Sequence, residues 1–120
     1  MAEVIELAEG NAAGCCDSRV PRRFDDAEAK QLSDELDILA HPIRLQILGI
    51  LAQSEGHVCV CDLESALPVK QPTVSHHLRL LREAGLVDSE RRGLWAYYFV
   101  RRDRLEALRQ HVFTQLTKLT

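Results

Sequence analysis

The sequence predicts a mainly α fold (α+β) with one short β-hairpin toward its C-terminal end. Over most of the chain, apolar residues recur every three or four positions, the spacing that buries one face of an α-helix. After Gly85 the spacing changes to two, which is typical of a strand, and an aromatic-rich segment over residues 94–100 completes the hairpin. A length of 120 residues suits one ordinary domain with its own core.

Residues 1–24 are expected to form a flexible N-terminal arm, and residues 25–120 a single folded domain. The arm has few large apolar side chains and no helix or strand period, and Pro21 closes it. It also lacks the basic start and apolar stretch of a secretory signal. No apolar run in the chain approaches the ~20 residues that cross a bilayer. We therefore expect a cytoplasmic protein with no membrane partner.

The first part of the domain is predicted to contain two helices. Leucines on one face indicate a helix over residues 27–39. His41-Pro42 then interrupts the pattern, and a second helix is expected over residues 43–51, because proline suits the first turn of a helix.

A short strand and two further helices are expected to follow. The alternating run over residues 58–61 predicts the strand, and Asp62 is a plausible cap for a helix over residues 63–67. After a tight connection, another helix is expected to begin near Pro72 and to end at Gly85, since glycine commonly follows a helix C-terminus. Its apolar residues face inward together, so its polar side chains occupy the outer surfaces.

The C-terminal part is predicted to form the hairpin and one last helix. Arg91-Arg92-Gly93 is expected to be the basic tip of the hairpin. On the last helix, the apolar residues are Leu105, Leu108, Val112, Leu116 and Leu119. Their spacings of three and four give a seam that a small domain cannot easily bury alone, so a partner helix is expected.

Two short helices joined by a tight turn and followed by a basic hairpin predict a winged helix-turn-helix with a two-stranded wing. A helix of about 10–12 Å diameter fits the major groove of DNA, where short polar side chains reach base edges and phosphates. Residues 68–104 carry 8 basic and 4 acidic side chains, whereas residues 1–67 carry 5 basic and 13 acidic ones. The candidate DNA-binding residues are Gln71, Thr73, Ser75, His76, Arg79, Arg91 and Arg92. We therefore expect double-stranded DNA as a partner.

Three segments of the chain resemble the ArsR/SmtB family of metal-sensing winged-helix repressors. They are His41-Pro-Ile-Arg-Leu-Gln-Ile-Leu48, Val58-Cys-Val-Cys-Asp-Leu63 and Gln71-Pro-Thr-Val-Ser-His-His-Leu78. The resemblance implies a homodimer built from the first and last helices, and repression of a resistance operon until an inducer binds. We expect the dimer to bind an inverted repeat in the operator. No common catalytic motif is present, so we do not expect an enzyme.

Four cysteines form two closely spaced pairs, Cys15-Cys16 in the arm and Cys59-x-Cys61 in the domain. Adjacent cysteines lie ~3.8 Å apart at Cα, which is shorter than the usual disulfide span, so thiol ligands are favoured in the arm. In a strand, residues 59 and 61 project to one side about 6.6 Å apart at Cα, close enough for both sulfurs to reach one ion. Buried, unreactive cysteines are the alternative for this second pair. Thiolates select soft, thiophilic ions.

The resemblance narrows the choice of ligand. Cys59-Val-Cys-Asp-Leu63 matches the metal-box motif of arsenic and cadmium sensors in the family, but Glu64 stands where the original bacterial arsenic sensors have a third cysteine. The resemblance implies As(III) or Sb(III) as the inducer of an arsenic-resistance operon, held by Cys15 and Cys16 with Cys59 or Cys61. One alternative is Cd(II) or Pb(II) on all four cysteines. Another is a thiol-redox or persulfide-sensing repressor of the same fold.

The family's other common metal site, on the last helix, is not expected here. Asp103 is followed by Arg104-Leu105 where that site would need a histidine, and His111 lacks its usual carboxylate neighbour in the sequence. No organic cofactor is expected either.

Overall fold

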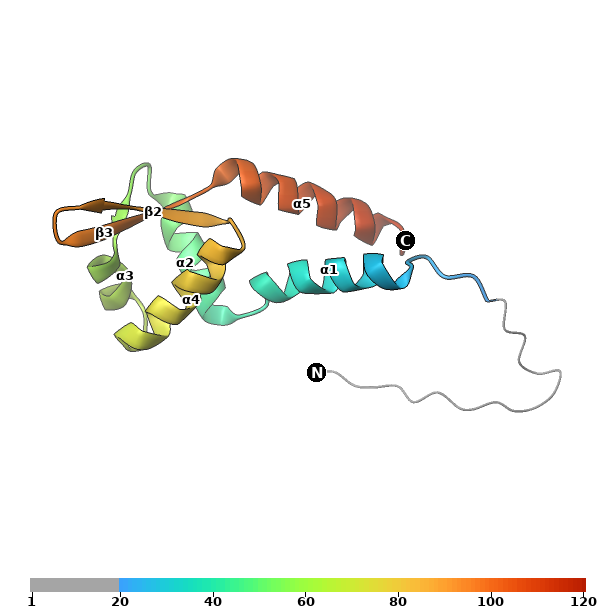
Figure 1. Ribbon diagram of the computed structural model, residues 1–120, viewed down its shortest axis with the longest axis horizontal. Helices are drawn as coiled ribbons and strands as arrows, with labels where there is room; N and C mark the ends of the chain where they lie inside the picture. The colour runs from blue at the N-terminus through green and yellow to red at the C-terminus, as the bar shows by residue number, and fades with distance from the viewer. Residues whose placement is uncertain (1–19) are drawn as a thin grey trace.

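The computed structural model describes residues 20–120, which form helices and a small antiparallel sheet (Figure 1). The elements in chain order are α1 (Asp26–Leu39), α2 (Pro42–Gln53), β1 (Val58–Cys59), α3 (Val60–Ala66), α4 (Gln71–Glu83), β2 (Val87–Arg92), β3 (Trp95–Val100) and α5 (Arg102–Thr117). Cys15, Cys16 and most of the predicted arm lie outside the described residues. No helix within residues 20–120 has the length and apolar character to cross a bilayer.

The core is built by α2, α3, α4 and the sheet. Its most deeply buried side chains are Ile47, Leu51, Leu63, Val74, Leu78, Leu81 and Val87. The apolar residues of α4 therefore face the core together, as their spacing predicted. This packing fixes which side of α4 faces outward, because residues three and four apart lie on one face of a helix.

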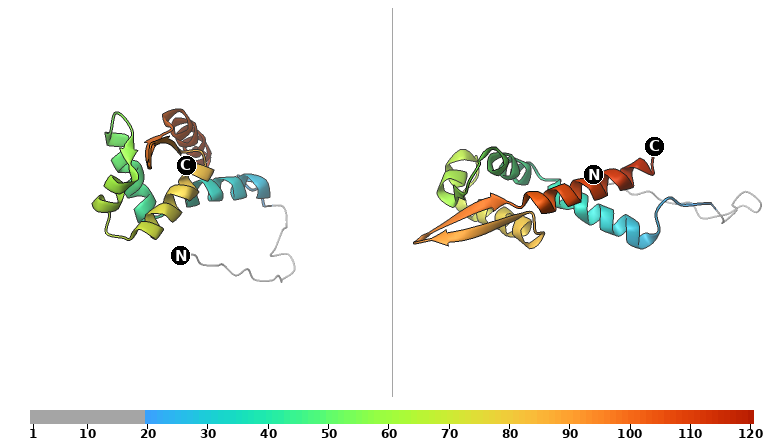
Figure 2. Two further views of the ribbon diagram at one scale, coloured as in Figure 1. Left: turned by 60° about the vertical axis from the view of Figure 1, so that its left-hand side comes forward. Right: turned by 90° about the horizontal axis from the view of Figure 1, so that it is seen from above.

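Helices α1 and α5 lie side by side and extend away from this core (Figures 1 and 2). Leu32 is the buried residue of α1, and α5, described over its whole length, has none. Large apolar side chains stay exposed on or next to the two helices: Leu36, Phe113, Leu116 and Leu119. The apolar seam predicted for the last helix is thus covered only in part by α1.

Side-chain caps fix where the first two helices begin. Asp25 accepts a hydrogen bond from the Glu28 amide at 2.7 Å, and Glu28 accepts one from the Asp25 amide at 2.9 Å. His41 caps α2, where its Nδ1 accepts from the Ile43 amide at 3.1 Å, and Pro42 follows as the first helical residue. The His41-Pro42 dipeptide is therefore a helix start.

The predicted two-stranded wing is confirmed as the hairpin of β2 and β3. Strand β1 adds a third member, with the sheet order β1-β3-β2. Gly93 has a φ of 65°, the left-handed conformation that a two-residue hairpin turn needs. Arg91 and Arg92 belong to β2, so the prediction that they form the tip is wrong: the tip is Gly93-Leu94.

The strand predicted over residues 58–61 is only half correct. Strand β1 ends at Cys59, and α3 already begins at Val60. Cys59 is the N-cap, and its sulfur accepts from the Cys61 amide at 3.4 Å, so the predicted cap Asp62 lies in the first turn instead. Four alternating residues are too few to distinguish a strand from a strand that turns into a helix.

Candidate nucleic-acid interface and thiol pair

Helices α3 and α4 form the helix-turn-helix, and α4 presents the polar side predicted to meet DNA. Val74, Leu78 and Leu81 are buried. The five candidates on this helix are all exposed: Gln71, Thr73, Ser75, His76 and Arg79. The structure therefore exposes every helix residue that the sequence predicted for DNA contact.

The exposed side of α4 has a mixed charge. Arg79 lies 3.8 Å from Glu83 and 3.1 Å from the His76 ring nitrogen, and Arg82 lies 3.5 Å from Asp88. These arginines must exchange an acidic neighbour for a phosphate if they bind DNA. Exposed ion pairs of this kind contribute only about 0–1 kcal/mol to stability, so replacing the carboxylate by a phosphate costs little free energy.

Lys70 is a candidate contact that the sequence analysis missed. It is exposed and occupies the N-cap of α4, where its side chain makes no capping hydrogen bond. Among residues 20–120, no acidic side chain forms an ion pair with it. A free cation beside the positive end of a helix favours a phosphate. Its position directly before the Gln71-Pro72 helix start was the available signal.

The two wing arginines are held differently. Arg92 lies 3.7 Å from Glu90 and 5.0 Å from the centre of the Tyr97 ring, so its guanidinium is directed along the hairpin. Arg91 donates a hydrogen bond to the Leu94 carbonyl at 3.3 Å, which places it at the turn. The hairpin projects from the end of the molecule opposite the free ends of α1 and α5 (Figure 2). Arg91 is therefore the better placed of the two for a phosphate beyond the tip.

Cys59 and Cys61 lie together at the start of α3. Their sulfurs are 2.7 Å apart, with Cys59 buried and Cys61 exposed. The convergence expected from a strand is thus produced by the strand-to-helix transition. The hydrogen bond between the two sulfurs raises the pKa of the Cys61 thiol.

The donor set fits a soft ion only in part. Two thiols in contact supply two sulfur ligands, and no group of three metal-ligating side chains occurs within residues 20–120. An ion that takes three or four thiolates needs sulfur from elsewhere. The remaining cysteines of the chain, Cys15 and Cys16, lie outside the described part.

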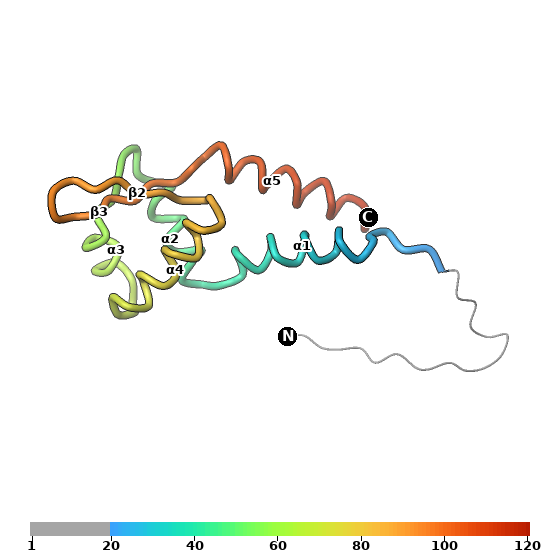
Figure 3. Tube along the Cα trace, viewed as in Figure 1, coloured from blue at the N-terminus to red at the C-terminus, as the bar shows by residue number. Residues whose placement is uncertain are grey.

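The thiol pair is connected to the wing and to α5. Cys59 pairs with Tyr97 in the sheet. His57, two residues before Cys59, lies 3.0 Å from Glu90 of β2. The trace shows β3 running directly into α5 (Figure 3). Strand β1 is therefore linked through β3 to both the hairpin and the last helix.

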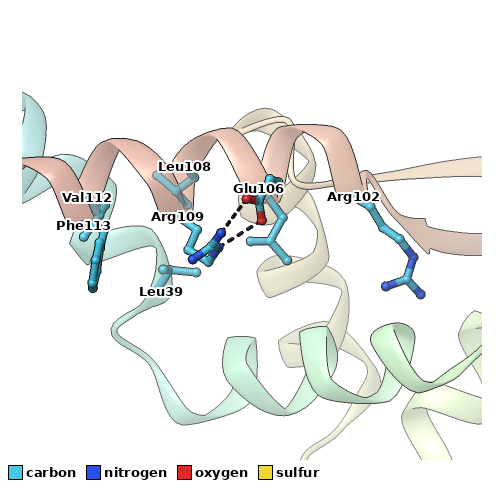
Figure 4. A pocket seen from close by; sticks show the side chains of 8 residues that line it. Leu39, Arg102, Glu106, Leu108, Arg109, Val112 and Phe113 are labelled. Carbon is cyan, nitrogen blue, oxygen red and sulfur yellow. Dashed lines mark hydrogen bonds and ion pairs between the residues drawn. The ribbon is translucent and has the colours of Figure 1, made fainter.

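A groove runs along α5 beside the end of α1 (Figure 4). Its apolar lining residues are Leu39, Leu105, Leu108, Val112 and Phe113. Glu106 and Arg109 form an ion pair in it at 2.5 Å, and this pair lowers the pKa of Glu106 to about 2. On the same helix, His111 lies 2.7 Å from Glu35 of α1, a carboxylate partner that its sequence neighbours did not reveal.

Comparison with protein families identifies a match in the DNA-binding region. The model described as bacterial regulatory protein, arsR family, matches residues 41–89. Among curated relatives, the arsenical resistance operon repressor of Escherichia coli (strain K12) is 48% identical over 61 residues, which cover 51% of this chain and 51% of that protein. The chain therefore spans about half of that relative.

Two other relatives are covered more completely. The arsenical resistance operon repressor of Staphylococcus xylosus is 36% identical, with 69% of this chain and 78% of that protein covered. The cadmium resistance transcriptional regulatory protein CadC of Listeria innocua is 32% identical, with 70% of each covered. The relatives thus carry names for different metals.

Solved structures share the fold. A crystal structure of a possible transcriptional regulator for arsenical resistance has a TM-score of 0.61 and 32% identity, covering 68% of this chain and 82% of that one. A homodimeric winged helix-turn-helix DNA-binding domain from Mycobacterium bovis has a TM-score of 0.58 and 29% identity, covering 86% and 89%. The predicted winged helix-turn-helix is confirmed.

Proposed function

The chain belongs to the ArsR family of bacterial transcriptional regulators, and on this premise we propose that it represses an arsenic-resistance operon. Two subunits bind an inverted repeat in the operator, and As(III) or Sb(III) on cysteine thiolates releases them. Family membership also agrees with the prediction that the chain is not an enzyme, because the family consists of DNA-binding regulators.

The exposed side of α4 supports the DNA-binding role. Ser75, His76 and Arg79 are exposed there, with Lys70 at the N-terminal end. Side chains that donate and accept hydrogen bonds at close range suit base edges, and the cations suit phosphates. In a two-fold dimer, two such helices read half-sites about 34 Å apart.

The uncovered apolar residues of α1 and α5 support the homodimer. Phe113 is 67% exposed and Leu116 is 40% exposed in the single chain. A second copy of the same two helices offers a matching apolar surface, and the similar M. bovis domain is homodimeric.

The observation that carries the sensing role is the 2.7 Å contact between the sulfurs of Cys59 and Cys61 at the N-cap of α3. One thiol of this pair, Cys59 or Cys61, gives one ligand of the As(III) site, and we assign the other two sulfurs to Cys15 and Cys16 of the arm. An ion held by this pair would lie at the N-cap of α3, where Cys59 Sγ also accepts from the Cys61 amide at 3.4 Å. Its binding would therefore act on the start of the helix-turn-helix.

The test is a titration of the protein–DNA complex with arsenite, antimonite and Cd(II). The probe is a duplex that the unmodified protein selects from a random-sequence library. We expect arsenite to lower DNA affinity by about 5- to 150-fold, the usual range of allosteric coupling, and DNA to weaken arsenite binding by the same factor. Unchanged DNA affinity with every one of these ions would contradict the sensing role.

Single Cys→Ser variants locate the ligands. We expect Cys15→Ser and Cys16→Ser to weaken the arsenite response while DNA affinity without arsenite stays unchanged. If both variants respond like the unmodified protein, the arm is not part of the site. Loss of the response when any one of the four cysteines is replaced would instead favour Cd(II) or Pb(II).

The same sulfur contact supports a second candidate, a thiol-redox repressor. Two thiols react with hydrogen peroxide to give a Cys59–Cys61 disulfide and two molecules of water, with two electrons passing from sulfur to peroxide oxygen. A polysulfide would instead leave persulfides on the thiols. Release of DNA by peroxide or polysulfide but not by arsenite, with linked or persulfidated cysteines in mass spectra, would favour this candidate.

A further inference from the structure

His77 is the buried polar side chain of the described core, and it lies in the middle of the recognition helix α4. It is 6% exposed, whereas its neighbour His76 is exposed. A buried imidazole must have its polar atoms satisfied, because an unpaired polar atom in the core is destabilising. The hydrogen-bond partner of His77 therefore shows which part of the fold is tied to the middle of α4.

That partner is Arg44 of α2, which joins three parts of the fold. Its Nε donates a hydrogen bond to His77 Nδ1 at 3.2 Å. Its Nη1 donates to the carbonyls of Asp37 and Ile38 at 3.1 Å and 3.2 Å. These carbonyls belong to the last turn of α1, and the Asp37 carbonyl also accepts from the Ala40 amide at 3.2 Å. One guanidinium thus ties the end of α1 to the centre of α4.

We propose that the Arg44–His77 hydrogen bond is a positioning contact for DNA recognition, which holds α4 at the angle to α1 that the operator requires. This inference rests on the proposed DNA-binding role. Because α1 belongs to the surface assigned to the second subunit, the contact also transmits the dimer geometry to α4. Arg44 and His77 lie 33 residues apart in the chain, and neither is among the exposed residues assigned to DNA.

The contact has a protonation requirement. Arginine is always a donor, so His77 Nδ1 accepts and must carry no proton. The groups facing the ring are all potential cations: Arg44, the His41 ring at 4.2 Å and the His76 ring at 5.2 Å. Burial, followed by the charges of His41, Arg44 and His76, lowers the pKa of His77. The hydrogen bond is therefore intact at neutral pH and is lost as the pH falls through this lowered pKa.

The test compares the pH dependence of DNA binding in the unmodified protein and in His77→Asn. Asparagine places an amide oxygen near the position of Nδ1, so it accepts from Arg44 but does not titrate. With a duplex selected by the unmodified protein at pH 7.5, we expect similar affinities at that pH. Below the pKa of His77, the affinity of the unmodified protein relative to that of His77→Asn should fall by up to about a hundredfold per pH unit, because the dimer carries two His77 side chains.

His76→Asn is the matched control, because it removes the exposed imidazole next to His77. We expect this variant to keep the loss of affinity at low pH. Parallel pH profiles for the unmodified protein and His77→Asn would overturn the inference.

Arg44→Lys provides a second, independent measurement. Lysine keeps the charge, but its single nitrogen cannot hold His77 and the two carbonyls in the same fork geometry. We expect roughly tenfold weaker DNA binding at pH 7.5, with an unchanged far-UV circular dichroism spectrum. DNA affinity equal to that of the unmodified protein would overturn the inference and leave the proposed function intact. Failure of the unmodified protein to select any DNA would overturn both.

Discussion

One sulfur atom has two partners at the start of α3. Cys59 Sγ accepts from the Cys61 amide at 3.4 Å and contacts the Cys61 sulfur at 2.7 Å. The first interaction caps a helix, and the second prepares the proposed site. A substitution that preserves the cap and removes the thiol therefore separates folding from sensing.

Cys59→Ser is that substitution. Serine is a preferred N-cap residue, so we expect the free energy of unfolding to stay within about 1 kcal/mol of that of the unmodified protein. The arsenite response should be lost, because a hydroxyl does not replace a thiolate toward a soft ion. Urea unfolding and the DNA titration measure the two quantities. A variant that folds normally and still responds would show that Cys59 is not a ligand.

The protonation of the thiols distinguishes the candidate ions. The raised pKa of Cys61 keeps its thiol protonated at neutral pH. Thiols that exchange with arsenious acid release water, with no net change in protons, whereas thiols that bind Cd(II) each release a proton. Below the thiol pKa values, we expect Cd(II) affinity to rise with pH by up to about tenfold per proton released, and As(III) affinity to change little. Calorimetric titrations in buffers of different ionisation enthalpy count the protons.

At the scale of single elements, α4 combines buried apolar residues with an exposed polar side. The cations on that side differ in their partners. Arg79 is 3.8 Å from Glu83, whereas Lys70 has no acidic partner among residues 20–120. A cation without an acidic partner contributes directly to phosphate binding, because it gives up no ion pair when DNA arrives.

Lys70→Gln is expected to weaken binding to all DNA sequences to a similar extent. It removes one phosphate contact per subunit, so the slope of log affinity against log salt should decrease by about 2 for a dimer. Lys30→Gln is a matched control, since Lys30 is on α1 and is paired with Asp34 at 2.8 Å. Fluorescence anisotropy at several salt concentrations measures both slopes. An unchanged slope for Lys70→Gln would remove Lys70 from the interface.

Most helices were predictable because their apolar residues recur at helical spacing over a long stretch of sequence. The four-residue spacing of Val74 and Leu78 identifies the buried side of α4, and the structure confirms it. The start of α3 was not predictable, because it depends on Cys59 leaving a strand that is only two residues long. The Arg44–His77 and Glu35–His111 contacts were also missed, since they join residues 33 and 76 positions apart. The spacing of apolar residues along a helix indicates which side is buried, whereas contacts between distant residues depend on the tertiary fold.

On the scale of the whole molecule, the core lies between α2, α3, α4 and the sheet, and α1 and α5 extend beyond it (Figure 1). The two helices contact each other but leave large apolar groups exposed. A surface of this kind is typical of an interface between subunits. The dimer proposed here therefore uses the part of the chain that contributes least to the core.

Phe113→Glu tests this assignment. Phe113 is 67% exposed in the single chain, so the substitution leaves the core untouched while placing a charge in the proposed interface. We expect a folded monomer with weakened DNA binding, measured by sedimentation velocity, circular dichroism and fluorescence anisotropy with labelled DNA. Leu94→Glu is the control, because Leu94 is 88% exposed at the wing tip and should leave the dimer intact. A dimeric Phe113→Glu protein would place the interface elsewhere.

Only Arg101 separates β3 from α5. The hairpin and α5 are therefore joined by a single residue, and β1, which carries Cys59, pairs with the hairpin strand β3. A hybrid regulator built from this chain should therefore exchange β1 through α5 as one segment, because a splice inside it would separate the proposed cysteine site from the helices of the proposed dimer.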